Sequence, residues 1–122
     1  PWSLAFGYNQ AELTTHVTRQ LTIAGQTAVD ATGAPRHEGD MCGQMTLALD
    51  NLESVLKAAG MGLGDITRIG IFTTDMDQTF QHFDIFGARM GQANAAPPMT
   101  LLGVTRLALP PLMIEIEATA AA

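Results

Sequence analysis

The sequence is poor in cysteine, and this scarcity excludes two kinds of stabilising cross-link. The single Cys42 has no partner for a disulfide within the chain. The three histidines, His16, His37 and His82, are scattered and combine with this one cysteine in no spacing typical of metal ligands. We therefore predict no structural zinc and expect the fold to depend on its apolar core.

Basic residues and long apolar runs are also scarce. Six Lys and Arg residues against twelve Asp and Glu residues give a net charge of −6, and the six basic residues are dispersed, so a nucleic-acid partner is not expected. No run of about 18 apolar residues predicts a membrane span, and the first residues show no signal-peptide pattern. We expect a cytoplasmic protein without a membrane partner.

What the sequence does contain is enough apolar material for one domain. With 122 residues and 47% hydrophobic content, residues 1–122 are expected to form a single compact domain. The first ten residues mix aromatic and small side chains, which suits a short edge strand or an ordered arm. The amine of Pro1 could act as a base or nucleophile. Removal of an initiator methionine is the interpretation we favour for this proline.

The first half of the chain predicts a strand, a long loop and a helix. Residues 18–24 are rich in β-branched side chains and alternate, and residues 25–39 carry glycine and proline. Asp40 is a helix N-cap and Gly60 a left-handed C-terminal cap. Between these two caps one apolar stripe recurs at helical spacing: Met45, Leu49, Leu52, Leu56 and Ala59.

The second half predicts a strand, a helix and two strands. Residues 66–74 alternate as a strand, and Asp75 or Asp77 caps the next helix. The buried side of that helix is expected to hold Phe80, Phe83, Phe86 or Gly87, and Met90. Residues 100–107 and 112–119 predict the last strands, and residues 120–122 a frayed tail.

Two helices and four or five strands favour a two-layer α+β domain, because two helices cover one face of such a sheet. The other face is expected to carry a mixture too apolar for bulk water and too polar for a core: Gln20, Thr22, Phe72, Met113, Glu115 and Glu117. This mixture predicts burial of that face against other subunits.

A set of short motifs, in order and at family spacing, resembles the Rid family, the YjgF/YER057c/UK114 group that is also labelled endoribonuclease L-PSP. The motifs are Ala24-Gly25-Gln26, Gln44, Ala48 to Leu52, Leu56 to Gly60, Gly64-Asp65-Ile66, Thr74-Asp75 and Ile114 to Ala118. The resemblance implies a chorismate-mutase-like fold and a homotrimer whose sheets form a central barrel. It also implies ligand clefts between subunits and hydrolysis of imines or enamines, such as 2-aminoacrylate, without cofactor or metal.

The resemblance also assigns candidate site residues. Glu115 matches the glutamate that positions or activates the attacking water, and Gly25 matches a glycine whose backbone lies against the ligand. Tyr8 and Asp84 are candidates for the family's tyrosine and asparagine positions. We expect Glu115 to lie in a cleft flanked by Met113, Met99 and Leu101.

Three site positions depart from the family pattern. Met99 stands where the family has an arginine that holds the substrate carboxylate, Leu101 replaces a frequent cysteine and Ala24 replaces a serine. A thioether carries no charge, and each lost hydrogen bond to a charged group costs about 1.5–3 kcal/mol. The substrate is therefore expected to be less acidic and more apolar than 2-aminoacrylate.

Two functions stay open on this basis. The first is an enzyme, a cofactor-free imine or enamine deaminase that uses Glu115. The second is a non-catalytic trimer that binds a small apolar metabolite or a protein, with Glu115 bonded to backbone amides of a neighbouring subunit. Ribonuclease activity, which only the family label implies, is disfavoured by the negative charge and by the absence of a His/Lys pair at a telling spacing.

Overall fold

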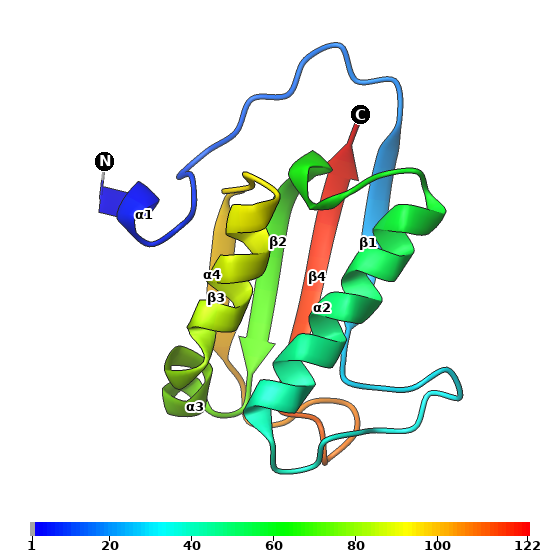
Figure 1. The fold of residues 1–122 in the computed structure, drawn as a ribbon, viewed down its shortest axis with the longest axis vertical. Helices are drawn as coiled ribbons and strands as arrows, with labels where there is room; N and C mark the ends of the chain where they lie inside the picture. The colour runs from blue at the N-terminus through cyan, green and yellow to red at the C-terminus, as the bar shows by residue number, and fades with distance from the viewer. Residues whose placement is uncertain (1) are drawn as a thin grey trace.

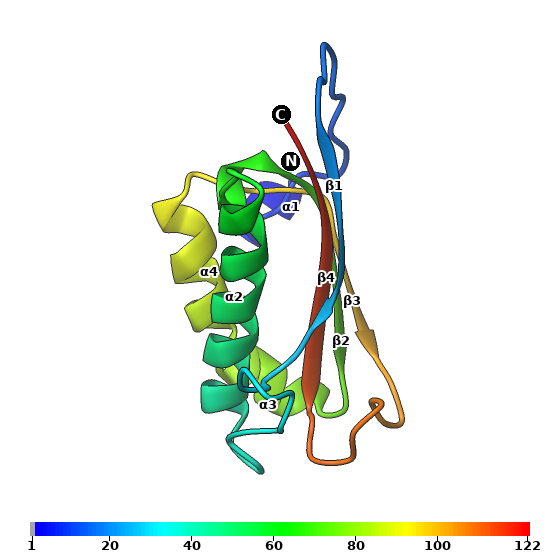
Figure 2. The same cartoon turned by 90° about the vertical axis from the view of Figure 1, so that its right-hand side faces the viewer.

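The computed structural model describes residues 2–122, and the prediction about the amine of Pro1 lies outside them. A four-stranded mixed sheet in the order β1-β4-β2-β3 carries helices on one face and leaves the opposite face uncovered (Figures 1 and 2). The predicted two-layer α+β architecture is confirmed.

The sheet combines antiparallel and parallel pairs. Its strands are β1 (Gln20–Gln26), β2 (Ile66–Thr73), β3 (Met99–Gly103) and β4 (Ile114–Ala121). β4 pairs antiparallel with both β1 and β2, and β3 pairs parallel with β2. β1 and β3 are therefore the two edges, and the prediction of a strand over 100–107 is too long at its end.

The C-terminal tail is part of the sheet, so the prediction that residues 120–122 fray is wrong. Ala120 is fully buried and pairs with Leu21. The backbone N–H of Ala122 donates to the carbonyl of Arg19, and the carbonyl of Ala122 accepts from the N–H of Arg19. Small alanine side chains fit under the helices, and the backbone ladder with β1 orders the chain to its last residues.

Helix α2 (Met41–Ala58) supplies more of the main core cluster than any other helix or strand, and it agrees with its predicted caps. The Asp40 carboxylate accepts a hydrogen bond from the Gly43 N–H at 3.1 Å, and Gly60 has φ of +71° after the last turn. Met45, Leu49, Leu52 and Leu56 are fully buried against the sheet. The predicted apolar stripe is thereby confirmed at these four positions.

The second predicted helix is broken into α3 (Met76–Gln81) and α4 (Phe83–Gln92), with His82 at the junction. Asp75 caps α3 by accepting from the Gln78 N–H at 3.0 Å. Phe86 and Met90 are buried as expected, but Phe80 is 63% exposed. The prediction for Phe80 is wrong because the break places it on a separate short helix that does not continue the buried stripe of α4.

The N-terminal residues form a short helix, α1 (Trp2–Ala5), where a strand or an arm was considered. Its Ser3 is buried, and the Asn9 N–H donates to the Ala96 carbonyl at 2.8 Å. Exposed residues 10–19 then cross to β1, which lies at the opposite edge of the sheet from β3 (Figure 1). These contacts place α1 beside α4 and β3.

Two buried or half-buried amides fasten the long loops to α2. Gln44 donates to the Pro111 and His37 carbonyls at 2.8 and 3.2 Å and accepts from the Met113 N–H at 2.7 Å. Asn51 donates to the carbonyls of Thr27 and Val29.

A one-turn 3-10 helix, η1 (Leu63–Asp65), leads into β2. None of the helices within residues 2–122 is long and apolar enough to cross a bilayer.

Candidate functional site

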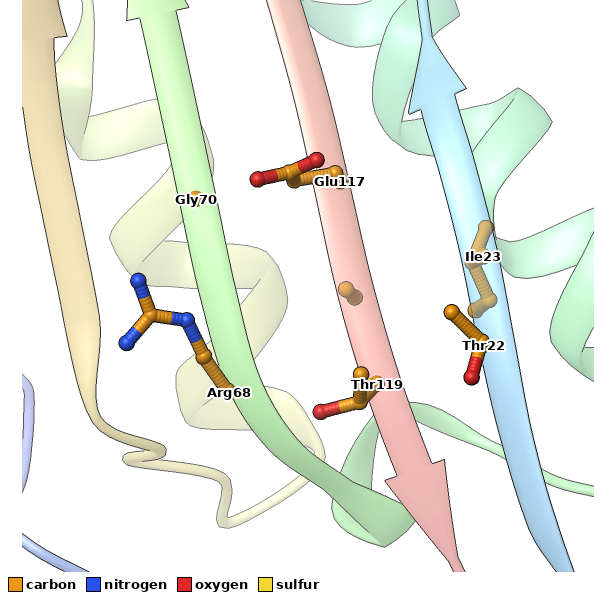
Figure 3. Close-up of a pocket in the computed structure, with 7 residues that line it drawn as sticks. Thr22, Ile23, Arg68, Gly70, Glu117 and Thr119 are labelled. Carbon is orange, nitrogen blue, oxygen red and sulfur yellow. The ribbon is translucent and has the colours of Figure 1, made fainter.

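The uncovered face of the sheet carries the predicted carboxylates. Thr22, Arg68, Glu117 and Thr119 project from β1, β2 and β4 on the side away from the helices, and they border a shallow hollow of about 150 Å³ (Figure 3). Glu115 lies on the same face, two residues before Glu117 on β4. This polar surface is the face that the sequence predicted to meet other subunits.

Glu115 is half-buried and lies against the backbone of Gly25 on β1. A Cβ atom built on Gly25 would overlap the Glu115 Oε2 atom and would lie 2.5 Å from Cδ and 2.7 Å from Cγ of the same side chain. No other residue type therefore leaves the carboxylate where it is. Gly25 and Glu115, predicted separately as site residues, form one contact.

A β-bulge creates this contact. The register between β1 and β4 shifts between Ile23, which pairs with Ala118, and Gln26, which pairs with Ile116. Ala24 and Gly25 together therefore lie opposite Glu117. A bulge increases the local twist and redirects the strand, and bulges are common beside functional sites. The exposed Ala24 is placed by the same bulge next to the glutamates.

Glu117 forms a similar contact on the other neighbouring strand. A Cβ built on Gly70 would lie 2.9 Å from the Glu117 Oε1 atom. Among residues 2–122 no hydrogen bond or ion pair reaches the carboxylate of Glu115 or Glu117. Two unpaired carboxylates thus share one face, and both are available to a ligand, a water molecule or a neighbouring chain.

A second concave region lies at the β3 edge, on the helix side of the sheet. It has a volume of about 460 Å³. We call it the edge cavity, and it is lined by Trp2, Phe6, Tyr8, Phe80, Phe83, Met99 and Leu101. Trp2 meets Tyr8 edge-on with ring centroids 6.0 Å apart, and Phe83 stacks on Phe86 at 5.0 Å.

The strand register separates the edge cavity from Glu115. Met99 and Leu101 pair with Ile69 and Ile71, whose side chains lie in the core beneath the helices. Glu115 pairs with Phe72, which follows Ile71 and points to the opposite face. Within a single chain Met99 and Leu101 therefore do not flank Glu115, and the expected cleft between subunits stays a prediction.

The predicted site residues thus fall into two groups. Ala24, Gly25 and Glu115 lie together on the uncovered face, whereas Tyr8, Met99 and Leu101 line the edge cavity. Asp84 is exposed on α4 and lines neither region, so its assignment stays a prediction.

Sequence reasoning missed the aromatic walls of the edge cavity: Trp2, Phe6, Phe80 and Phe83. One signal was available, since Trp2, Phe6 and Tyr8 are three of only seven aromatic residues and fall within the first eight positions. Such a concentration in one short segment indicates a docking role for that segment. Its contact with α3 and α4 is a long-range feature that local pattern does not reveal.

The fold and these two regions describe an α+β protein whose four-stranded sheet has an uncovered, carboxylate-bearing face. A family model described as endoribonuclease L-PSP matches residues 3–122. The chain belongs to this family, the Rid or YjgF/YER057c/UK114 family that its motifs resembled.

Individual relatives agree with this assignment. A RutC family protein from Pyrococcus horikoshii is 30% identical over 100 residues, which are 82% of this chain and 77% of the relative. The structure of the Rid-family protein YyfB from Yersinia pestis is similar with a TM-score of 0.86 and 34% identity, covering 98% of this chain and 90% of YyfB. Escherichia coli TdcF, crystallised with bound serine, gives a TM-score of 0.76 at 26% identity and covers 94% and 87% of the two chains.

Proposed function

We propose that the protein is a cofactor-free deaminase that hydrolyses a small imine or enamine in clefts formed between copies of this chain. The observation that carries the proposal is the Glu115 carboxylate, held against Gly25 on the uncovered sheet face with no partner among residues 2–122. A fixed carboxyl group without a structural bond is free to handle protons and water.

One carboxyl group is sufficient for this chemistry. An enamine first takes a proton at carbon and becomes an iminium ion. Water then adds to the iminium carbon while the Glu115 carboxylate accepts a proton from it, and the protonated Glu115 then donates this proton to the nitrogen of the resulting carbinolamine. Cleavage of the C–N bond releases ammonia and leaves a carbonyl group, so one water is consumed for each imine.

The cleft requires a second chain. Within one chain Glu115 and the edge cavity lie on opposite faces of the sheet, so a ligand cannot touch both. A neighbouring copy whose uncovered face packs against the β3 edge would bring its own Glu115 toward Met99 and Leu101. A homotrimer with three such clefts satisfies this requirement and would bury the mixed polar and apolar sheet face.

Specificity in this proposal differs from that of a small imino acid. TdcF was crystallised with serine, which suits a site that holds a charged amino acid. Here Met99, which lies in the edge cavity, occupies the position of the family's arginine. The guanidinium of an arginine can bind a carboxylate through two charge-assisted hydrogen bonds, and the thioether of Met99 cannot. The substrate is therefore expected to lack a carboxylate or to hold it elsewhere.

The test compares ammonia release from imines that an amine or amino-acid oxidase generates in situ. We expect Glu115→Gln to lower the enzyme-dependent rate at least about 100-fold, the usual contribution of a general acid or base. Glu117→Gln is the matched control, since it removes the neighbouring carboxylate on the same strand and is expected to retain the rate. Equal rates for wild type and Glu115→Gln would contradict the proposal.

A second function is favoured by the size and apolar lining of the edge cavity. In this alternative the protein is a trimer that binds a small metabolite without turning it over. Saturable binding together with no ammonia release above buffer, for any imine tested, would support the alternative. Turnover that depends on Glu115 would exclude it.

A further inference from the structure

We infer that the ligand is a neutral molecule with an aromatic ring, and that this ring enters the edge cavity. The inference rests on the proposed function only for the reaction that follows binding. Its own basis is the size, the lining and the charge of the cavity. Each of these excludes a different class of ligand.

The size of the cavity fits a small organic molecule. Pockets that hold such ligands commonly measure about 300–1,000 Å³, and the edge cavity has about 460 Å³. A two-carbon or three-carbon imine would leave most of this space filled with water against apolar walls. A ring with a short side arm fills it better.

The lining favours an aromatic ring over an aliphatic chain. Five aromatic side chains from α1, the residues just after it, α3 and α4 surround the space, and Trp2, Phe6 and Phe80 are 64%, 69% and 63% exposed. Exposed rings grouped around one cavity are unfavourable in water, and such apolar patches mark binding sites. Rings that already meet one another edge-on offer the same geometry to a further ring.

The charge of the lining excludes a carboxylate within the cavity. Among residues 2–122, no Arg, Lys, Asp or Glu contributes to its walls, and the polar side-chain groups there are the Tyr8 hydroxyl and the Trp2 indole N–H. The nearest arginine along α4, Arg89, is bonded to Asp50 and Glu53 at 2.7 and 2.8 Å. An unpaired carboxylate in such a site would lose its hydration without compensation.

A neutral aromatic imine places the protein after one class of reaction. An amine oxidase transfers two hydrogens from a primary arylalkylamine to its cofactor and yields an imine without a carboxylate. Addition of water to that imine releases ammonia and leaves the corresponding arylalkyl aldehyde. The product would then be passed to an aldehyde-oxidising or aldehyde-reducing reaction.

Binding is tested with two probes of equal size, phenylacetamide and phenylacetate, which differ in charge. Trp2 is the only tryptophan of the chain and lines the cavity, so its fluorescence reports on occupancy. We expect phenylacetamide to change this fluorescence saturably and phenylacetate to bind at least about tenfold more weakly. Serine, small and charged, is expected to leave the fluorescence unchanged.

Variants locate the ring. Phe80→Ala is expected to weaken the binding of phenylacetamide about 3- to 10-fold, the range that aromatic pairs contribute. Phe80→Leu, which keeps apolar volume and removes the ring, should weaken this binding as well. Leu109→Ala is the control, because Leu109 is an exposed apolar residue that does not line the cavity. Met99→Arg should shift the preference toward phenylacetate.

Three outcomes would overturn the inference: no saturable change in Trp2 fluorescence, phenylacetate binding as tightly as phenylacetamide, or both Phe80 variants binding like wild type. Ammonia release by the wild-type protein separates this inference from the proposed function. If aromatic imines bind in this way but wild type releases no ammonia from them, the inference stands and the deaminase proposal fails.

Discussion

At the scale of single residues, the site depends on two glycines that each make room for a glutamate. Gly25 lies under Glu115 and Gly70 under Glu117. In both pairs the atoms that a new Cβ would meet belong to the flexible glutamate side chain. An alanine at either position therefore moves a carboxylate and leaves the backbone in place.

We expect Gly25→Ala to lower deaminase activity about 100-fold, the effect of misplacing a reacting group by roughly 1 Å. Its melting temperature should stay close to that of wild type. Steady-state rates and thermal unfolding measure the two effects. Gly70→Ala is the matched control and should displace Glu117 while retaining activity; equal losses in both variants would contradict a special role for Glu115.

Gln44 is the residue whose loss should cost the most stability outside the apolar core. Gln44→Met would keep most of the volume but leave the Met113 N–H and the Pro111 carbonyl without their partners. Unsatisfied buried polar groups cost about 1–3 kcal/mol each, so we expect these two groups to lower the free energy of unfolding by about 2–6 kcal/mol. Urea titration measures it. Thr46→Ala is the control, because Thr46 lies two residues after Gln44 on α2. This substitution should change the free energy of unfolding by less than about 1 kcal/mol.

At the scale of elements, the short helix α3 presents Phe80 to the edge cavity and depends on its cap. Asp75 is the N-cap of α3 and accepts hydrogen bonds from the N–H and the side-chain amide of Gln78 at 3.0 and 2.9 Å. The bond from the Gln78 N–H is the main reason that the pKa of Asp75 lies below its ordinary value in the folded protein. α3 should therefore loosen in acid.

The direction of this pH effect follows from the lowered pKa. The stabilisation by Asp75 is fully present above its unfolded pKa and is lost as the pH falls through its lower folded pKa. We expect the difference in melting temperature between wild type and Asp75→Asn to be constant above pH 5 and to shrink as the pH falls below about 4. The pKa of Asp30 is also lowered, chiefly by a hydrogen bond from Thr32. Since Asp30 is present in both proteins, its contribution to the pH dependence cancels in the difference. A difference independent of pH would contradict this role.

At the scale of the whole molecule, the two faces of the sheet make the proposed site a property of the assembly. Glu115 lies on the uncovered face, and the edge cavity lies on the helix side. Light scattering is expected to give three times the mass of one chain. A monomer in solution would contradict both the trimer and the shared cleft.

Mixing two inactive variants tests the shared cleft directly. Glu115→Gln keeps the cavity, and Leu101→Lys keeps the carboxylate but places a charge in the cavity. If each cleft takes these parts from different chains, co-refolded mixtures should regain activity in about a quarter of their clefts, as random pairing at head-to-tail interfaces predicts. Each variant alone, refolded in the same way, is the control. No gain on mixing would place the site within one chain.

Local pattern predicted much of this architecture and part of the site. The apolar spacing of Met45, Leu49, Leu52 and Leu56 predicted the buried face of α2, because a helix repeats every 3.6 residues. The alternation around Glu115 predicted that it shares a face with Glu117. The family motifs identified Gly25, although its steric reason, the contact with Glu115, follows only from the β-bulge at Ala24 and Gly25.

From the sequence alone followed the order of the four strands and of α2, the core of α2 and the presence of carboxylates on an uncovered sheet face, since these depend on neighbours along the chain. That Met99 and Leu101 face away from Glu115 follows from the packing of the folded chain, because the register of β3 on β2 sets which side each residue takes. The same packing brings α1 and the exposed Phe80 together around an aromatic cavity. Contacts between segments about 80 residues apart depend on the packing of the whole chain, which no local period records.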